Sequence, residues 1–529
     1  MSFTSFAFIL FMLAIIVAYF VVPKKYQWVV MLLANIYFYI SGGVKYILYI
    51  LSASLLTYVG ARVFEKINNE TKNKINTAET TEEKKAIRLA SISRKKSITL
   101  VIVLLVMGVW AVIKYGNFVI DNLNALFSAL NIDYTIGGLS IVMPLGMSYF
   151  SFQAVGYMTD VYRSKYPAQR NFFKYFTFVS FFPHIMQGPF SRYDILGKSI
   201  FEEHKFDYDR LCQGTARIIW GFFKKIVIAD QIGISVDKIF DNYQDYTGFN
   251  ILCVVFMYAI QIYADFSGYM DIACGFSRIL GIELQENFNQ PYFAKSIEEF
   301  WRRWHMTLGQ WFRDYMFYPI SMSKVAQKLG KQSRKVLGNK WGRLLPSYFA
   351  LVFVWTCTGL WHGANWTFLV WGYLNFIVIV LGMHWAEYYK KAREFCHIKE
   401  GNTLWEGFRI IRTFALVAFF RFFSVADTVN IAFGMIRRMF TEFKFMNTAV
   451  SIKNFFPGLR MVQLLTMLFG ICMLFIVDIL REKGLWEAKK ENTPLFLRSV
   501  IYAMLILLIY LVVPALGQLE SGDFLYANF

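Results

Sequence analysis

Two histidines have neighbours that suit proton transfer, and both stand in a strongly apolar chain. His305 lies within residues 300–315, a segment that also carries three tryptophans, three arginines and Asp314. His362 follows Trp361 at the end of an apolar run. A neutral imidazole can take a proton from a hydroxyl near pH 7. Since ionisable residues at membrane depth usually face a water-filled cavity or a substrate path, these residues predict a functional site.

Each of these histidines also has a structural explanation. If residues 298–311 form one helix, its charged side chains and its tryptophans fall on different faces, which is typical of an amphipathic helix at a membrane interface. His362 could be a buried histidine that is bonded to a carbonyl. However, Gly359 and Asn365 nearby predict a frayed helix end with exposed backbone.

A third histidine, His184, lies in an interrupted apolar segment. Pro183, Gly188 and Pro189 break residues 172–189, because proline has no backbone donor and ends helices. We expect a re-entrant or kinked element here. Non-helical backbone at that depth is tolerated when it packs in protein or lines a cavity. His184 is therefore a candidate for lining the same cavity.

Two buried carboxylates are better explained by structure than by catalysis. Asp265 and Asp271 are six residues apart, so they do not share a helix face, and Gly268 between them suggests a bend. An unpaired charge at membrane depth is costly. We expect these carboxylates to pair with arginines of the following segment, namely Arg302, Arg303 or Arg313.

The composition predicts an all-α polytopic membrane protein. The chain has 529 residues, of which 56% are hydrophobic and 19% aromatic, and its apolar segments are long enough to span a bilayer. The alternating ten-residue segments of an outer-membrane barrel are missing. The net charge of +19 comes from lysines and arginines in loops, which is the positive-inside pattern rather than a nucleic-acid surface. Six scattered cysteines predict neither a disulfide nor a metal site.

We expect about 11–13 transmembrane or re-entrant helices in a single domain over residues 1–529. The first apolar run lacks a basic region and a cleavage site, so it is interpreted as a membrane helix rather than a signal peptide. The polar residues 62–97 are interpreted as a cytoplasmic amphipathic connector, with partner docking as the alternative. Both termini are then extracytoplasmic, in the cytoplasmic membrane of a bacterium and in contact with its lipid. The predicted segments are N-terminal spans (1–60), a basic cytoplasmic loop (61–98), a catalytic core (139–386), C-terminal spans (387–514) and an extracytoplasmic tail (515–529).

Several motifs together carry a resemblance to a known family. They are residues 261–271 (QIYADFSGYMD), 287–292 (NFNQPY), 299–308 (EFWRRWHMTL), 311–315 (WFRDY) and 359–366 (GLWHGANW), with 182–189 and 420–426 in support. The chain resembles the membrane-bound O-acyltransferase family. It is most similar to the bacterial branch that O-acetylates alginate, peptidoglycan and related polymers, with the teichoic-acid D-alanyl transfer proteins as cousins.

The resemblance implies a fold, a reaction and site residues. The fold is a ring of tilted helices around a central acyl-transfer tunnel, in which a cytoplasmic thioester, acetyl-CoA, meets an acceptor from the other side. His362 matches the catalytic histidine and His305 the second active-site position. His362 would deprotonate an acceptor hydroxyl, and His305 or Asn365 would hydrogen-bond the oxyanion. The other candidates for lining the site are Trp361, Trp304, His184, Asp265 and Asp314.

Basic residues between 321 and 343 are candidates for holding the donor. This stretch has no acidic residue, which positive-inside anchoring explains on its own. The alternative is a landing site for the phosphates of coenzyme A. The candidates are Lys324, Lys328, Arg334 and Lys335.

The C-terminal residues 523–529 resemble a short aromatic tail of this bacterial branch. There a tyrosine hydroxyl would relay the acyl group to an extracytoplasmic partner of the SGNH-hydrolase type, which acts on a polysaccharide. Tyr526 matches that position, although Ala527 stands where another aromatic residue is expected. An aromatic anchor at the lipid headgroups is the alternative for Tyr526.

The predicted function is transfer of an acyl group, acetyl in the first instance, across the membrane for a cell-surface polysaccharide. D-alanyl transfer to teichoic acid is the nearest alternative. A transporter or flippase for a lipid-linked sugar, with Asp265, Asp271 and the histidines relaying protons, is the alternative from another class. The pattern does not identify the polymer, the partner protein or the oligomeric state.

Overall fold

The computed structural model describes the whole chain except residues 1–4, 142, 400, 445–455 and 513–529. Within the described ranges the secondary structure is helical, and the only extended pairing is an isolated antiparallel bridge between Phe288 and Trp304. The all-α fold class is confirmed.

Seven described helices are long and apolar enough to cross a membrane by length and composition. They are Val44–Thr77, Thr81–Ala129, Gly248–Leu280, Asn339–His362, Trp366–Phe395, Met461–Glu482 and Leu495–Val512. The shorter apolar helix α1 (Phe6–Val21) precedes them. These helices confirm the polytopic membrane class. The predicted total of 11–13 also counted shorter and interrupted helices, and it stays a prediction.

The chain divides into two compact units that do not follow the predicted segments. The first unit contains residues 1–214 and 276–285, and the second contains residues 215–275 and 286–529. The predicted single domain and its segment boundaries stay predictions. Each unit is described by itself.

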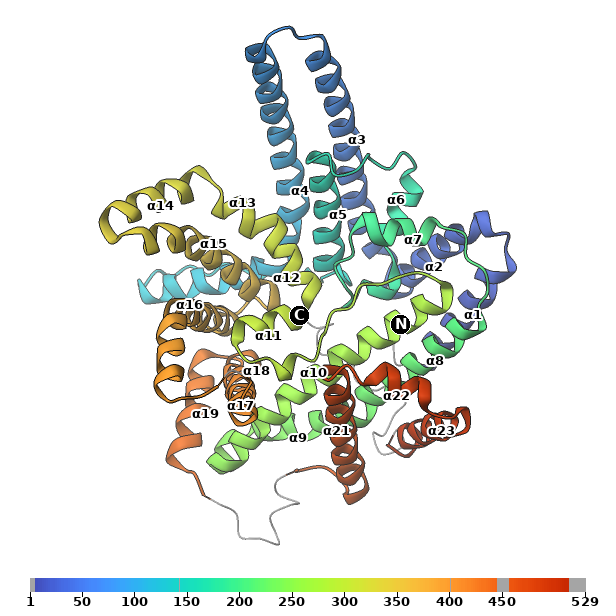
Figure 1. The fold of residues 1–529 in the computed structure, drawn as a ribbon, viewed down its shortest axis with the longest axis vertical. Coiled ribbons are helices and arrows are strands. Elements are labelled where there is room, and N and C mark those ends of the chain that lie inside the picture. Colours follow the sequence, from blue (N-terminus) through green and yellow to red (C-terminus); the bar gives the residue numbers. More distant parts are fainter. Residues whose placement is uncertain (1–4, 142, 400, 445–455, 513–529) are drawn as a thin grey trace. The chain divides into compact units, whose positions relative to one another are not determined.

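In the first unit, the polar insertion is helical almost throughout. After α2 (Gln27–Gly42), α3 (Ile47–Thr77) and α4 (Thr81–Ala129) run side by side as a long hairpin (Figure 1). Thr80 and Glu83 form a capping box that starts α4, since each side chain satisfies a backbone N–H of the other. The polar insertion is therefore mostly helical, because α3 and α4 extend into it from both sides, and its role as a cytoplasmic amphipathic connector stays a prediction.

The interrupted segment of the first unit is confirmed. After α5 (Met147–Tyr162), α6 (Phe172–Val179) ends early, and a 3₁₀ turn (Phe182–His184) is followed by irregular backbone. Residues 175–191 are all buried. Short α7 (Lys198–Phe201) follows, and α8 (Tyr208–Phe222) leads into the second unit.

The second unit holds the remaining helices. Residues Phe223–Ala229 form a π-helix between α8 and α9 (Asp230–Asp241). Helix α10 (Gly248–Leu280) follows, and its residues from 276 onward belong to the first unit. The following helices are α11 (Ile297–Arg303), α12 (Met306–Phe312), α13 (Tyr318–Ser321), α14 (Lys324–Leu337), α15 (Asn339–His362), α16 (Trp366–Phe395), α17 (Thr403–Phe420), α18 (Phe422–Val425), α19 (Val429–Thr441), α21 (Met461–Glu482), α22 (Trp486–Asn492) and α23 (Leu495–Val512).

Candidate active site

His305 lies at a break between two helices, not within one. Helix α11 ends at Arg303, and α12 begins at Met306. His305 has φ +46° and ψ +51°, a left-handed conformation that is uncommon outside glycine. The expectation of one continuous amphipathic helix through residues 298–311 is therefore wrong. Such strained backbone persists only where the surroundings fix it, and it is common at functional sites.

Asn287 fixes this break from a distant part of the chain. Its backbone carbonyl accepts from the Met306 N–H at 3.0 Å, and its side-chain Oδ1 accepts from the Thr307 N–H at 3.1 Å and from the Thr307 hydroxyl at 2.8 Å. Two donors on one oxygen establish which end of the Asn287 amide faces this turn. The left-handed turn is thus held by contacts that the local sequence does not contain.

The same amide oxygen orients the imidazole of His305. Nδ1 of His305 lies 3.2 Å from Oδ1 of Asn287. Because an amide oxygen can only accept, Nδ1 carries the proton and Nε2 is the acceptor in the neutral ring. His305 is 3% exposed, and burial lowers its pKa to about 3, so the ring is neutral near pH 7. A neutral His305 with this tautomer accepts at Nε2 and does not donate there.

His362 is the last residue of α15 and packs against the start of α16. Its ring centroid lies 4.8 Å from that of Trp371 on α16. The two helices can approach closely because Gly359 and Gly372 have no side chain. A β-carbon on Gly359 would lie 2.6 Å from the Phe368 carbonyl oxygen, and one on Gly372 would lie 2.7 Å from the Trp355 carbonyl oxygen. Larger residues at these glycines would separate Trp371 from His362.

Trp361 connects the two histidines. Its ring centroid lies 5.8 Å from that of His305 and 5.0 Å from that of His362. All three residues are at most 5% exposed. The structure therefore brings together the two predicted catalytic residues and one predicted lining residue, although they come from different helices.

Arg421 was not among the predicted site residues, and it lies in this cluster. It follows α17, and its guanidinium carbon lies 5.3 Å from the ring centroid of Trp304, the fourth predicted residue in the cluster. Arg421 is 3% exposed, and its Nε and Nη2 have no hydrogen-bond partner in the described part of the chain. A buried charge without a partner is costly. The signal in the sequence is an arginine within the apolar run of residues 414–426.

A small cavity lies beside these groups. Its volume is about 10 Å³, and it is lined by Tyr258, Ile262, His362, Phe368, Trp371, Arg421 and Ser424. This volume admits about one water-sized atom. The cavity therefore places one oxygen-sized space next to a histidine and a buried guanidinium.

Asn365 is placed differently from the prediction that it donates to an oxyanion. Its side-chain oxygen caps α16 by accepting from the Thr367 N–H at 3.0 Å, and its amide nitrogen donates to the Asp427 carbonyl at 2.7 Å. Both ends of the amide are thus used in holding the turn after His362. Asn365 positions the loop, and Arg421 is the better placed donor.

The carboxylates on α10 are paired, but with partners other than those expected. Asp265 binds Lys225 at 2.9 Å, and Lys225 also binds Asp230 at 2.8 Å. Asp271 binds Lys224 at 2.7 Å and Arg217 at 2.8 Å. The partners come from α8 and the π-helix after it, whereas Arg302, Arg303 and Arg313 bind other carboxylates: Glu298, Glu299 with Glu482, and Asp314. The structural explanation holds, and the predicted arginine partners are wrong.

The remaining predicted residues lie in several other parts of the chain. Asp314 lies in π-helix after α12, 3.7 Å from Arg313, and His184 belongs to the first unit, where its ring is fully buried beside Phe181. Lys324, Lys328, Arg334 and Lys335 are exposed on α14. Tyr526 lies outside the described residues. No group of three or more His, Cys, Asp or Glu side chains is arranged for a metal ion in the described ranges.

Comparison with known proteins identifies the family. The family model described as MBOAT, membrane-bound O-acyltransferase, matches residues 37–333. A probable alginate O-acetylase, AlgI, of Azotobacter vinelandii is 32% identical over 70% of this chain and 66% of its own length. A peptidoglycan O-acetyltransferase of Helicobacter pylori is 30% identical over 53% and 54%. A teichoic acid D-alanyltransferase of Bacillus subtilis is 30% identical over 48% and 62%.

The matches cover 66%, 54% and 62% of the length of these three relatives, which is less than two thirds in each case. The matched part includes the interrupted segment around His184, helix α10 and the turn at His305. The family model alone covers more than half of the chain. This chain belongs to the membrane-bound O-acyltransferase family.

Proposed function

We propose that the protein is a membrane O-acyltransferase that passes an acetyl group from cytoplasmic acetyl-CoA across the membrane for O-acetylation of a cell-surface or secreted polysaccharide. The observation that carries the proposal is the cluster of His305, Trp361, His362 and Arg421 beside a cavity for one oxygen atom. The similarity to O-acetylases of alginate and peptidoglycan supports acetyl as the acyl group and a polysaccharide as the acceptor.

The transfer needs one base and one stabilised oxyanion. His362 takes the proton of the acceptor hydroxyl while the hydroxyl oxygen bonds to the thioester carbon. Arg421 donates to the carbonyl oxygen as that oxygen gains negative charge. When the carbon–sulfur bond breaks, the proton held by His362 passes to the departing thiolate. The products are an acetyl ester and the free thiol of coenzyme A.

His305 has a different role in this scheme from the predicted one. Because Asn287 holds its proton on Nδ1, the neutral ring offers only an acceptor at Nε2. His305 then orients the acceptor hydroxyl towards the thioester rather than donating to the oxyanion. Burial of the whole cluster excludes bulk water, which protects the thioester from hydrolysis.

The test uses purified protein in liposomes with acetyl-labelled acetyl-CoA at the cytoplasmic face. The native chain transfers label to an acceptor, and His362→Ala lowers the transfer rate by about 10²–10⁴-fold, the usual contribution of a general base. Tyr526→Phe tests the relay to an extracytoplasmic SGNH-type partner: if Tyr526 carries the acetyl group, label on the C-terminal peptide is lost. Transfer that is as fast in His362→Ala as in the native chain would refute the proposal.

D-alanyl transfer is the second candidate, because a teichoic acid D-alanyltransferase matches at 30% identity. A D-alanyl carrier protein supplied in place of acetyl-CoA distinguishes the two donors. The transporter hypothesis requires Asp265 and Asp271 to relay protons, whereas both carboxylates are held in ion pairs, which fits a structural role better. Transport of an intact lipid-linked sugar without an acyl product would restore it.

A further inference from the structure

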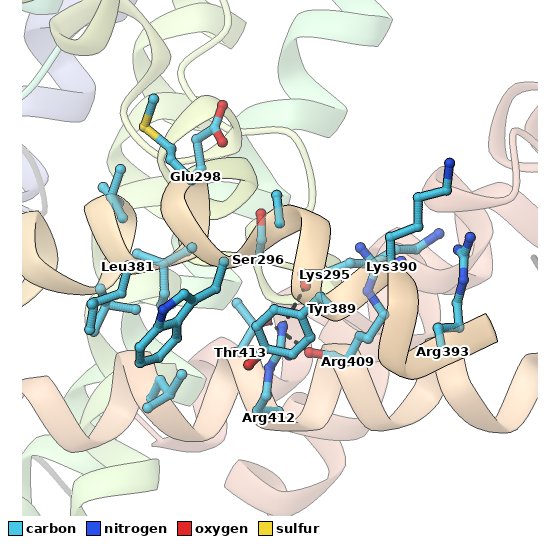
Figure 2. Close-up of a pocket in the computed structure, with 18 of the residues that line it drawn as sticks. Lys295, Ser296, Glu298, Leu381, Tyr389, Lys390, Arg393, Arg409, Arg412 and Thr413 are labelled. Atoms are coloured by element: carbon cyan, nitrogen blue, oxygen red, sulfur yellow. Dashed lines mark hydrogen bonds between the residues drawn. The ribbon is translucent and has the colours of Figure 1, made fainter. Parts of the chain in front are cut away.

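A second cavity of the second unit is large and basic. Its volume is about 590 Å³, and it runs between α16, α17 and the chain at residues 295–298. In Figure 2, Leu381 lies towards one end of the pocket, whereas Lys390 and Arg393 extend from a helix at the other. None of the residues that line it lines the small cavity beside His362.

The charges of this basic pocket are unbalanced. One carboxylate, that of Glu298, lines it together with five cations, which are Lys295, Lys390, Arg393, Arg409 and Arg412. Glu298 is already paired with Arg302, one helical turn along α11. The pocket therefore has an excess of positive charge, which favours an anion such as a phosphate.

The nearby ion pairs leave part of this excess in place. Glu406 is shared by two of the cations, with 2.6 Å to Lys295 and 3.1 Å to Arg409. Arg412 donates to the Lys295 carbonyl at 2.9 Å, a contact that orients the guanidinium without cancelling its charge. Lys390 lies 4.0 Å from Glu394, one turn further along α16. Glu406 thus holds two cations in position beside Arg412.

The polarity of the pocket changes along its length. Its aliphatic residues Val378, Ile379 and Leu416 lie where α16 and α17 are closest in sequence to the catalytic cluster. The cations lie towards the other ends of the two helices, in company with the aromatic side chains Trp385, Tyr389 and Trp405. Such an arrangement suits a ligand with an apolar arm and an aromatic, phosphorylated head.

The apolar end is also near the catalytic cluster. Trp371, which contacts His362, is eight residues before Ile379 on α16, a separation of about 12 Å at 1.5 Å per residue. Arg421 follows Leu416 by five residues, or about 8 Å on the same basis. A pantetheine arm has a backbone as long as about four residues, roughly 14 Å when extended. Arg412 precedes Arg421 by nine residues, or about 14 Å on the same basis, so the arm spans the distance from a phosphate held at Arg412 to the cluster, and the cations at the end of α16 are left to the nucleotide head.

We propose that the basic pocket binds the phosphorylated adenosine head of the acyl donor, and that the pantetheine arm runs along the apolar end to the catalytic cluster. The proposal rests on the proposed function and assigns the donor's binding residues to α16 and α17 instead of α14. The positive-inside pattern predicts that the basic end of α16 faces the cytoplasm, where the donor is available.

The experiment measures binding of coenzyme A to the full-length protein in nanodiscs of neutral lipid, with 3′-phosphoadenosine 5′-diphosphate as a competitor that has no thiol arm. The variant is Lys390→Gln/Arg393→Gln, two cations at the last turns of α16. We expect the Kd to rise about 10–100-fold, since each charged hydrogen bond lost costs roughly a factor of ten or more. The competitor displaces coenzyme A from the native chain and much less effectively from the variant.

The matched control is Lys85→Gln/Arg88→Gln on α4, which removes two exposed cations with the same spacing and leaves the Kd unchanged. Equal weakening by both variants would mean a general charge effect and would overturn the proposal. So would weakening by Lys328→Gln/Lys335→Gln on α14 instead, or an effect of the pocket variant that appears only when anionic lipid is added, which would indicate a lipid headgroup.

The transfer reaction separates failure of the pocket from failure of the proposed function. With acetyl-CoA the pocket variant raises KM at nearly unchanged kcat, whereas with acetyl-pantetheine, which lacks the nucleotide, native and variant chains behave alike. Normal binding of coenzyme A without any transfer by the native chain would refute the proposed function. Active transfer with the same KM in native and variant chains would refute the pocket.

Discussion

Buried charge is handled in opposite ways in two regions of the second unit. On α10, Asp265 and Lys225 are at most 2% exposed in their side chains, and each binds an opposite charge within 3 Å. Beside His362, Arg421 is buried to the same extent, yet its Nε and Nη2 lack a partner among the described residues. The first region balances its own charges, and the second does not.

This difference separates structural from functional buried charge. A buried pair repays its desolvation only when geometry and further hydrogen bonds are good, and the α10 group has both, since Lys224 also donates to Ser267 at 2.8 Å. Arg421 contacts the ring of Trp304, but its Nε and Nη2 make no hydrogen bond among the described residues that would repay their desolvation. It is explained if a substrate oxygen completes its contacts during the reaction. The comparison predicts opposite responses to mutation in the two regions.

The largest effect is expected on stability, from breaking the paired group. Lys225→Met leaves the carboxylates of Asp265 and Asp230 without their shared cation and should lower the free energy of unfolding by roughly 3–5 kcal/mol. Denaturant unfolding of the purified protein in detergent measures this. Adding Asp265→Asn and Asp230→Asn should recover most of the loss, and a single variant as stable as the native chain would contradict a structural role.

The next effect is expected on catalysis, from removing the charge without a partner. Arg421→Gln should lower kcat by about 10²–10³-fold, the usual cost of losing one oxyanion donor. Its stability should equal or exceed that of the native chain, because a buried charge has been removed. Arg421→Lys keeps the charge without the two-nitrogen geometry and should recover part of kcat. Strong destabilisation with an unchanged kcat would assign Arg421 to the structural class instead.

Much of this organisation could be predicted from the sequence, because it depends on local patterns. Long apolar runs predicted the helical membrane class, and prolines predicted the break near His184. The end of an apolar run predicted that His362 lies at the end of a helix. The pairing of buried carboxylates also followed from the cost of an unpaired charge, but their partners did not. The ion-pair partner of a buried carboxylate depends on which helix packs against it, and a single sequence does not predict that packing.

The break at His305 could not be predicted for the same reason. The local pattern of residues 298–311 is compatible with an uninterrupted helix, and what ends α11 is the contact with Asn287, 18 residues earlier. Arg421 becomes a site residue only when α17 brings it onto Trp304. The basic pocket likewise requires three separate elements to meet.

A smaller effect, about a tenfold fall in kcat, is expected when Asn287, which positions His305, is replaced. Asn287→Ala takes away the acceptor of the His305 Nδ1–H and of Thr307, so the tautomer of His305 is no longer fixed and kcat falls. Asn287→Asp keeps the acceptor and adds a negative charge, which raises the pKa of His305. The pH profile of kcat for Asn287→Asp should then show a new decline on the acid side. An unchanged profile with a tenfold lower kcat would indicate a structural role only.

The smallest effect concerns the pH dependence of stability, and its sign follows from the burial of His305. Asn287, Phe266 and Trp361, which contact its ring, are uncharged, and burial lowers the pKa of His305 to about 3. In the unfolded chain the pKa is about 6.5, so the unfolded state binds more protons below that pH. The stability due to neutral His305 is therefore fully present above about pH 6.5 and is lost as pH falls towards the folded pKa. Between pH 7 and pH 6 the loss is about 0.7 kcal/mol. His305→Gln cannot be protonated and should unfold with a pH slope smaller by this amount, whereas an identical slope would mean that the pKa of His305 is the same in the folded and unfolded chains and that burial does not keep the ring neutral.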